Sequence, residues 1–322
     1  MTASLSVRDL TVVLETGGGT FPVLDGVSFD LAPGQSRALV GESGGGKTLL
    51  ARAVMRLLPP AARVRAGAVL LDGVDLLRIP EREMAPRRGG AIGWVFQEPL
   101  DALDPVRSVG SQVAEAVRRH SASGAREARA RAIALLQEAG LAEAARRFDD
   151  PPHALSGGMR QRVMIAAALA GDPSVLIADE PTAALDPPLA SQVVALIDRL
   201  RRERGLALLH VTHDLRRAAE CDRVSVLYAG RIVEEASGAD FARTPRHPYA
   251  AALAASAAAR TPRRRLPAIP GAPPALADRA APRCAFAPRC PQVFGRCGEE
   301  KPELYPAGAS RARCFLYAPE AA

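Results

Sequence analysis

A glycine-rich segment near the start of the chain combines the residue types that bind phosphate groups. It follows an apolar run, precedes a helical pattern, and consists of Gly41, Glu42, Ser43, Gly44, Gly45, Gly46, Lys47 and Thr48. Glycines allow backbone N–H groups to approach phosphate oxygens at the positive end of the following helix. In a loop of this pattern Lys47 is expected to reach the β- and γ-phosphates of a nucleotide, and the Thr48 hydroxyl to ligate Mg²⁺.

A plain glycine-rich turn is the alternative interpretation of this loop, and the composition argues against it. The chain has 322 residues, and of its 42 basic residues only Lys47 and Lys301 are lysine. Arginine has thus replaced lysine almost everywhere, yet a compact ammonium group is kept where a phosphate loop needs one. The sequence therefore predicts a nucleotide phosphate site at residues 41–48.

Three later apolar runs carry polar residues that could act on a bound nucleotide. Asp179 and Glu180 close one run, Gln97 follows another, and His210 and His213 lie in and after a third. In a parallel sheet, Asp179 could hold Mg²⁺ through water at the C-terminal edge while Glu180 polarises an attacking water. Gln97 could orient Mg²⁺ or that water, and His213 or His210 could approach the γ-phosphate.

A second segment that could bind an anion lies at residues 155–162, which read LSGGMRQR and precede an Ala-rich helical pattern. Ser156 suits a helix N-cap, and Gly157 and Gly158 leave the first amides of the helix accessible. With this segment the sequence resembles the ATP-binding cassette (ABC) ATPases, whose signature is LSGGQ-like. The resemblance covers nearly the whole chain.

The resemblance implies ATP and Mg²⁺ as cofactors and gives roles to several polar residues. In this family two cassettes close head to tail on two ATP molecules, so Ser156, Gly157 and Gly158 are implied to contact the partner's ATP. The implied catalytic and coupling positions are Gln97 in the Q-loop, Glu180 as general base, His213 as switch histidine and Asp186 in the D-loop. The implied Mg²⁺ ligands are Thr48, Gln97 and Asp179.

One position departs from the family pattern. The residue that aligns with the aromatic side chain expected to stack on adenine is Leu14. Phe21 could substitute for it, or aliphatic side chains could hold the adenine.

The arrangement of apolar runs predicts an α/β fold. Short runs rich in Val, Ile and Leu alternate with longer helical patterns, which is typical of a parallel sheet. The expected strands are residues 37–40, 92–96, 175–178, 207–212 and 223–228. Helices are expected at 113–119 and 125–139, the second one with Gly140 at its C-terminal cap. The resemblance implies a P-loop NTPase fold, in which a RecA-like core carries an antiparallel β subdomain.

Three regions are expected along the chain. The nucleotide-binding core is expected at residues 1–97 and 166–235, and an inserted α-helical subdomain that ends in the signature at 98–165. A C-terminal extension is expected at 236–322. Its proline-rich residues 260–283 resemble a linker, and a cysteine-rich segment follows them.

Composition excludes several classes of protein. Aromatic residues make up only 4% of the chain, which argues against a surface that stacks on nucleic-acid bases. The basic residues that give the net charge of +7 are dispersed among acidic ones, so we expect no nucleic-acid partner.

The first residues lack a signal-peptide pattern, and no apolar run approaches the ~18–20 residues of a membrane-spanning helix. These features predict a cytoplasmic protein, in which clustered cysteines suggest a metal rather than disulfides.

Four cysteines lie close together near the end of the chain: Cys284, Cys290, Cys297 and Cys314. Four thiolates can hold Zn²⁺ or a [4Fe–4S] cluster, and their spacing alone does not choose between these or exclude free thiols and disulfides. A resemblance to the peptide-importer family favours the [4Fe–4S] cluster, with a structural role in the tail.

Several segments outside the cassette motifs resemble ATPases of oligopeptide and dipeptide importers. They are residues 97–105 (QEPLDALDP), His153, residues 246–249 (RHPY), residues 266–271 (LPAIPG) and residues 288–291 (PRCP). The resemblance implies an ATP-hydrolysing, energy-coupling subunit on the cytoplasmic face of the cell membrane. Its implied partners are a second ATPase, in a heterodimer rather than a homodimer, two permease subunits and an extracytoplasmic solute-binding protein. The alternatives are an importer of nickel or another small solute, or a soluble ABC ATPase that acts on nucleic acid or the ribosome.

Overall fold

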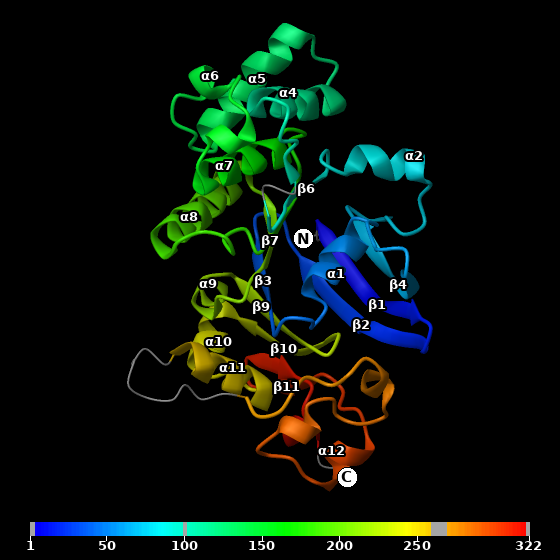
Figure 1. Ribbon diagram of the computed structural model, residues 1–322. Helices are drawn as coiled ribbons and strands as arrows, with labels where there is room; N and C mark the ends of the chain where they lie inside the picture. Colours follow the sequence, from blue (N-terminus) through cyan, green and yellow to red (C-terminus); the bar gives the residue numbers. More distant parts are fainter. Residues whose placement is uncertain (1–3, 99–101, 259–268, 320–322) are drawn as a thin grey trace. The chain divides into compact units, whose positions relative to one another are not determined.

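The computed structural model describes residues 4–98, 102–258 and 269–319 (Figure 1). The chain divides into two compact units. Unit 1 consists of Met1–Leu5, Leu31–Gln35 and Arg78–Leu209, and unit 2 of Ser6–Asp30, Ser36–Leu77 and His210–Ala322. Residues 99–101 of the QEPLDALDP segment lie outside the described residues, as do residues 260–268 of the expected linker.

Unit 1 contains the buried parallel strands that the sequence predicts. Strand β6 (Ile92–Val95) pairs in parallel with β7 (Val175–Asp179), and β8 (Ala207–Val211) is the next strand in the order. Every residue of β6 and β7 is buried, which explains why these segments read as continuous apolar runs. The observed strands agree with the predicted ones to within one residue at each end.

Five helices of unit 1 pack around one apolar core: α4 (Val109–His120), α5 (Ala125–Glu138), α6 (Ala144–Arg147), α7 (Gly157–Ala168) and α8 (Pro187–Arg204). The short helix α2 (Glu81–Met84) also belongs to this unit. Helix α4 begins four residues before the predicted start because Ser108 caps it, its hydroxyl accepting from the Ser111 N–H at 3.4 Å. Gly140, with φ 76°, follows α5 in the left-handed conformation expected after a helix.

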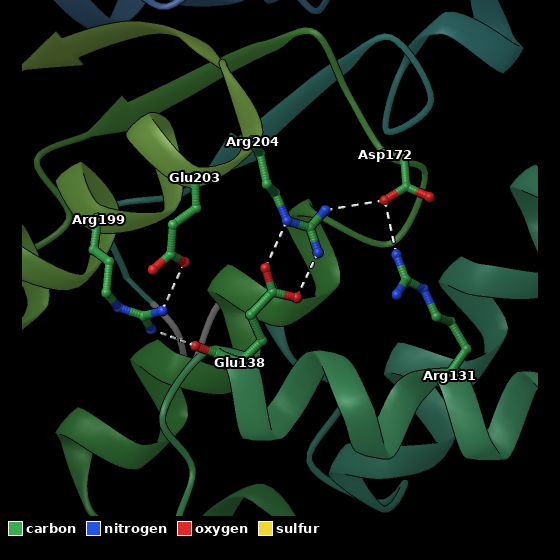
Figure 2. Close-up of polar contacts among 6 residues, drawn as sticks. All are labelled: Arg131, Glu138, Asp172, Arg199, Glu203 and Arg204. Carbon is green, nitrogen blue, oxygen red and sulfur yellow. Dashed lines mark hydrogen bonds and ion pairs between the residues drawn. The ribbon is translucent and has the colours of Figure 1, made fainter.

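A network of charged residues joins α5 to α8 within unit 1 (Figure 2). The Arg204 guanidinium, at the end of α8, donates to both carboxylate oxygens of Glu138 at 2.6 and 2.5 Å and to Asp172 at 3.0 Å. Arg131 also binds Asp172, at 2.8 Å. Because the Arg204 side chain is only 16% exposed, this pair is well placed to fix the two helices against each other.

Unit 2 contains a four-stranded sheet in the order β2-β1-β4-β5. Its strands are β1 (Leu5–Thr16), β2 (Gly19–Leu31), β4 (Ala62–Leu71) and β5 (Val74–Asp75), and β4 pairs with β5 in an antiparallel hairpin. In Figure 1, β1, β2 and β4 lie side by side.

A second sheet in unit 2 is mixed, with the order β11-β12-β10-β9-β3 followed by the end of β8. Strands β3 (Ser36–Val40) and β9 (Arg223–Tyr228) are parallel, whereas β10 (Arg231–Ser237), β11 (Tyr305–Ala307) and β12 (Ser310–Ala312) pair antiparallel. The last two strands come from the C-terminal extension. The tail is therefore held by strand addition to β10, which the sequence analysis does not foresee.

Further helices of unit 2 are α1 (Lys47–Val54), α9 (Leu215–Ala219), α10 (Gly238–Arg243), α11 (Pro248–Ala258) and α12 (Gly295–Glu299). Short 3₁₀ turns at Ala277–Ala280, Ala287–Arg289 and Phe315–Tyr317 complete the extension. Among the described residues, none of the helices combines the length and the apolar character needed to cross a bilayer.

Candidate functional site

The phosphate loop of unit 2 connects β3 to α1 and requires glycine where the chain is crowded. A Cβ atom on Gly41 would lie 2.2 Å from the Leu227 carbonyl oxygen, and one on Gly46 would lie 2.8 Å from Leu24 Cδ2. Gly46 also has φ 106°, a left-handed conformation that disfavours other residues. The glycines predicted from the sequence thus hold the loop against its neighbours and keep its backbone uncovered.

Lys47 and the start of α1 give this loop the character of an anion site. The Lys47 side chain folds over the loop, and its Nζ donates to the carbonyl oxygens of Gly41 at 2.9 Å and Glu42 at 3.1 Å. The N-cap of α1, Gly46, makes no side-chain cap bond, and the first turn carries no acidic residue. The positive end of α1 therefore faces no acidic side chain of its own first turn, and Thr48 lies in the same turn.

Asp179 and Glu180 adjoin the end of β7 in unit 1 but differ in environment. Asp179 is buried, with 2% of its surface exposed, whereas Glu180 is half-buried. Glu180 has φ 45°, in the left-handed region that residues other than glycine seldom adopt. Such strain persists where the surrounding structure enforces it, and it is common at functional sites.

Gln97 and the signature helix line one pocket of unit 1, with a volume of about 220 Å³. Gln97 comes from the segment after β6, Gly157 and Gln161 come from α7, and Leu185 comes from the loop before α8. Gln161 is 1% exposed, and its Nε2 has no hydrogen-bond partner among the described residues. The structure thus brings the predicted Q-loop and signature residues together within this unit.

The signature residues form the start of α7 as predicted. The Ser156 hydroxyl caps the helix by accepting from the Met159 N–H at 3.4 Å. Gly157 is exposed, whereas Gly158 is buried, and a Cβ on Gly158 would lie 2.5 Å from Leu189 Cδ2. The first glycine therefore leaves the helix end open, and the second permits close packing against α8.

Asp186 caps α8, because its carboxylate accepts from the Leu189 N–H at 3.0 Å. The sequence analysis assigns this exposed residue to the D-loop and does not foresee the capping role, although Pro187 at the first helical position indicates it.

The two histidines of the β8 region, which the sequence analysis leaves as alternatives, differ sharply in exposure. His210 lies inside β8 with 4% exposure, and burial lowers its pKa to about 4. His213 is exposed and follows the strand in unit 2. Only His213 is placed to meet a ligand.

The two candidates for adenine contact lie on the four-stranded sheet. Leu14 on β1 and Phe21 on β2 are both half-buried. Phe21 lies beside Gly19, whose Cβ would be 3.5 Å from the ring. Its role in adenine contact remains a prediction.

Three residues of the C-terminal region contact the phosphate loop, and the sequence analysis misses this role. Arg289 binds the Glu42 carboxylate with two nitrogens, at 2.8 and 2.9 Å, and the Tyr249 hydroxyl accepts from the Glu42 N–H at 2.8 Å. Arg279 donates to the Gly44 carbonyl oxygen at 3.1 Å. Tyr249 belongs to the RHPY segment and Arg289 to the PRCP segment. The sequence analysis therefore includes both residues as part of a family resemblance but assigns neither of them a function.

Comparison with known proteins identifies the family. The family profile described as "ABC transporter" matches residues 24–183, and the one described as "Oligopeptide/dipeptide transporter, C-terminal region" matches residues 233–297. The chain is 40% identical over 305 residues to the dipeptide transport ATP-binding protein DppD of Bacillus subtilis, a match that covers 92% of this chain and 90% of that protein. The chain belongs to the ABC transporter family.

Other ABC proteins extend the comparison. The oligopeptide transport ATP-binding protein OppD of Mycobacterium tuberculosis is 46% identical over 323 residues, 98% of this chain, but the chain spans only 52% of that relative's length. A dimeric ATP-binding cassette solved in a post-hydrolysis state with ADP and Pi matches with a TM-score of 0.65 and 29% identity, covering 72% of this chain and 98% of that one. Together with the mixed sheets, this likeness confirms the ABC-type P-loop NTPase fold.

The prediction of a [4Fe–4S] cluster is wrong for the structure described here. Among the described residues, no group of three or more His, Cys, Asp or Glu side chains is arranged to hold a metal ion. None of Cys284, Cys290, Cys297 and Cys314 forms a disulfide. Cys284 and Cys290 pack against one apolar cluster, Cys284 also packs against a second one that contains Cys297, and Cys314 lies in a third.

The physical reason is that the extension packs into an apolar core that it shares with β3 and β9. Phe286 and Tyr249, both buried, pack with their ring centroids 5.5 Å apart in this core, and Cys284 and Cys290 pack against it. Burial raises the pKa of Cys284 and Cys290, and that of Cys314 to about 11. These surroundings favour the neutral thiol, the form in which a buried cysteine packs as a small apolar residue.

The predicted ATP-site residues are divided between the two units. The phosphate loop, Phe21 and His213 belong to unit 2. Gln97, the signature, Asp179, Glu180 and Asp186 belong to unit 1.

Proposed function

We propose that this chain is the ATP-hydrolysing, energy-coupling subunit of an ABC importer for oligopeptides or dipeptides. One observation carries the proposal: a single chain combines a phosphate loop and a signature helix with the C-terminal region described for oligopeptide/dipeptide transporters at residues 233–297. The identity with DppD, which extends over 92% of the chain, supports the same substrate class. The proposed organisation is a core of 1–97 and 166–235, a helical subdomain of 98–165 and an extension of 236–322.

ATP fits the phosphate loop because the positive end of α1, whose first turn has no acidic residue, and the Lys47 ammonium both favour an anion. In the proposed bound state Lys47 exchanges the carbonyl oxygens of Gly41 and Glu42 for phosphate oxygens. Thr48, Gln97 and Asp179 would hold Mg²⁺, and their hydroxyl, amide and carboxylate oxygens are ligands that this ion prefers. Bound Mg²⁺ would neutralise charge on the β- and γ-phosphates.

Glu180 is the proposed general base for the attacking water. Its left-handed backbone and half-buried position support this role, as does its place next to the buried Asp179. His213 is the proposed switch histidine that contacts the γ-phosphate. Ser156, Gly157 and Gly158 are proposed to bind the ATP of a partner cassette, with Asp186 in the loop between the two sites.

The proposed partners are a second and different ATPase, two permeases and an extracytoplasmic solute-binding protein, with this chain on the cytoplasmic face of the membrane. Apolar side chains that flank the Gln97 segment support docking of a permease there. Phe96 is 41% exposed and Val106 is 87% exposed, both within unit 1.

The test is affinity purification of the tagged full-length chain from membranes in mild detergent, followed by an ATPase assay with added peptides. We expect two permeases and a second ATPase to co-purify, and oligopeptides with the solute-binding protein to stimulate hydrolysis. Stimulation by a nickel chelate instead of peptides would contradict the substrate class. Co-purification with ribosomes or nucleic acid in place of permeases would contradict the importer function.

A further inference from the structure

The phosphate loop is bound from the side by an arginine of the C-terminal extension. Arg289 Nη1 and Nη2 bind the two carboxylate oxygens of Glu42 at 2.8 and 2.9 Å, and the Arg289 side chain is 5% exposed. Two more of its five N–H donors bind the Pro270 carbonyl oxygen at 2.8 Å and the Tyr228 hydroxyl at 3.2 Å. A buried two-point pair of this geometry fixes the orientation of both side chains.

Glu42 is held at its backbone as well as at its carboxylate. Its N–H donates to the Tyr249 hydroxyl at 2.8 Å, and its carbonyl oxygen accepts from Lys47 Nζ at 3.1 Å and from the Gly45 N–H at 3.1 Å. The same carbonyl oxygen therefore joins the phosphate-binding lysine to the turn of the loop. Any movement of Glu42 changes the position of both.

The side chains that hold Glu42 are themselves rigid. Tyr249 is fully buried, and its ring packs against Tyr228 and Phe286 at centroid distances of 4.5 and 5.5 Å. The Arg289 guanidinium lies 5.8 Å from the Tyr228 ring centroid. A third contact, from Arg279 to the Gly44 carbonyl oxygen at 3.1 Å, reaches the next turn of the loop. The extension thus contacts the loop at two successive places from a packed aromatic cluster.

We propose that the C-terminal extension sets the ATP affinity of the cassette by positioning the phosphate loop, with Arg289 as the principal positioning residue and Tyr249 and Arg279 as its supports. The proposal rests on the assignment of residues 41–48 as the ATP phosphate loop. The Arg289 guanidinium donates to Glu42, Pro270 and Tyr228, so its effect is expected on the position of the loop and hence on binding, and not on the chemical step at Glu180. A structural change in the extension would then alter ATP binding without any change in the catalytic residues.

The test compares Arg289→Ala and Arg289→Lys in the full-length chain, by calorimetric titration with ATP and by steady-state ATPase kinetics of the assembled complex. We expect Arg289→Ala to raise the Kd and KM for ATP about tenfold, with kcat changed less than about twofold. Lysine keeps the charge but loses the two-point geometry, so Arg289→Lys should recover part of the affinity. The matched control is Arg296→Ala in the same extension, which removes a half-exposed pair with Glu300 at 3.1 Å and should leave both constants unchanged.

A second variant protects the test against misfolding. Glu42→Gln removes the charge from the loop side of the pair while the extension stays intact. We expect it to raise the Kd, and we expect Arg289→Ala to add less in this background than it does alone. A wild-type Kd for ATP in folded Arg289→Ala would overturn the proposal. The proposal would also be overturned if the effects of Glu42→Gln and Arg289→Ala on the free energy of ATP binding were fully additive in the double variant.

Lys47→Ala separates this inference from the proposed function. It should abolish measurable ATP binding, whereas Lys301→Ala, which removes the other lysine, should not. Wild-type binding by Lys47→Ala would contradict the assignment of the loop and hence both proposals. Lost binding in Lys47→Ala together with wild-type binding in Arg289→Ala would contradict only the positioning role.

Discussion

At the scale of single residues, Glu180 and Lys47 are unusual for their residue types. Glu180 has an unusual backbone conformation, and Lys47 is unusually buried. Glu180 has φ 45°, a conformation that costs about 1–3 kcal/mol outside glycine. Lys47 is only 6% exposed, an unusual position for a lysine, and its ammonium group donates to the carbonyl oxygens of Gly41 and Glu42. Departures of this kind are expected where function rather than stability sets the residue type.

Two buried histidines predict how stability depends on pH. Burial lowers the pKa of His210 to about 4 and that of His247 to about 3, from an ordinary value of 6.5. Below pH 6.5 the unfolded chain binds protons that the folded chain does not, so the free energy of unfolding falls as pH falls. At a pH well below 6.5 but above its pKa in the folded chain, each histidine should lower the free energy of unfolding by about 1.4 kcal/mol for each unit that the pH falls.

The measurement is the denaturant midpoint between pH 7.5 and pH 5. We expect His247→Gln to reduce the slope of stability against pH without abolishing it, because His210 and His120, whose pKa values burial also lowers, remain. His153→Gln, at an exposed position, is the control and should leave the slope unchanged. Equal slopes in the wild type and His247→Gln would refute the assignment.

At the scale of elements, the sequence predicts a strand or a helix best where one pattern of apolar residues dominates a segment. The strands around residues 92–96 and 175–178 are buried on both faces, so their apolar runs are unambiguous. The sequence analysis misses the hairpin of β11 and β12 because each strand has only three residues, too short for a clear alternation. Without this hairpin, the C-terminal tail is expected to lack an apolar core and to be stabilised by a metal cluster.

Side-chain networks are less predictable because they join residues distant in sequence. Arg289 and Glu42 are separated by 247 positions, and nothing local to either residue indicates the other. The N-terminal caps of α4 and α8 can be predicted from the residue types of Ser108 and Asp186, which are common at this position. For Asp186 the resemblance indicates only a coupling role.

The Arg204 network between α5 and α8 can be tested by Arg204→Ala (Figure 2). The change leaves Glu138, whose side chain is 28% exposed, without its two-point partner, so we expect a loss of about 2 kcal/mol in the free energy of unfolding. The hydrogen bond from Arg204 lowers the pKa of Glu138 below its ordinary value of 4.5. The stabilisation is therefore present at pH 7 and lost as pH falls below 4.5, where the carboxylate takes up a proton.

The measurement is chemical denaturation of both proteins at pH 7 and at pH 3.5. The control is Arg202→Ala on the same helix, which removes a 67% exposed arginine paired with Asp198 and should change stability by less than about 0.5 kcal/mol. An equal loss in the two variants would show that the network has no special role.

At the scale of the whole molecule, the cassette and the extension form one functional chain in this account. The fold could be predicted from the sequence because its motifs are short and each has a chemical reason, whereas the roles of the candidate ATP residues stay predictions. The contacts of the extension could not be predicted, because the spacing of cysteines says nothing about the apolar core of Phe286 and Tyr249 against which Cys284 and Cys290 pack. The extension contacts the phosphate loop through Arg289, Tyr249 and Arg279.

The most direct test of the central claim is ATP-driven uptake of a labelled oligopeptide by proteoliposomes that contain the complex assembled with this chain. With the solute-binding protein present, we predict uptake with the wild-type chain. With Glu180→Gln we predict unchanged ATP binding, and hydrolysis and uptake at least about 100-fold slower. Uptake at the wild-type rate with Glu180→Gln, or wild-type hydrolysis that moves no peptide, would contradict the account.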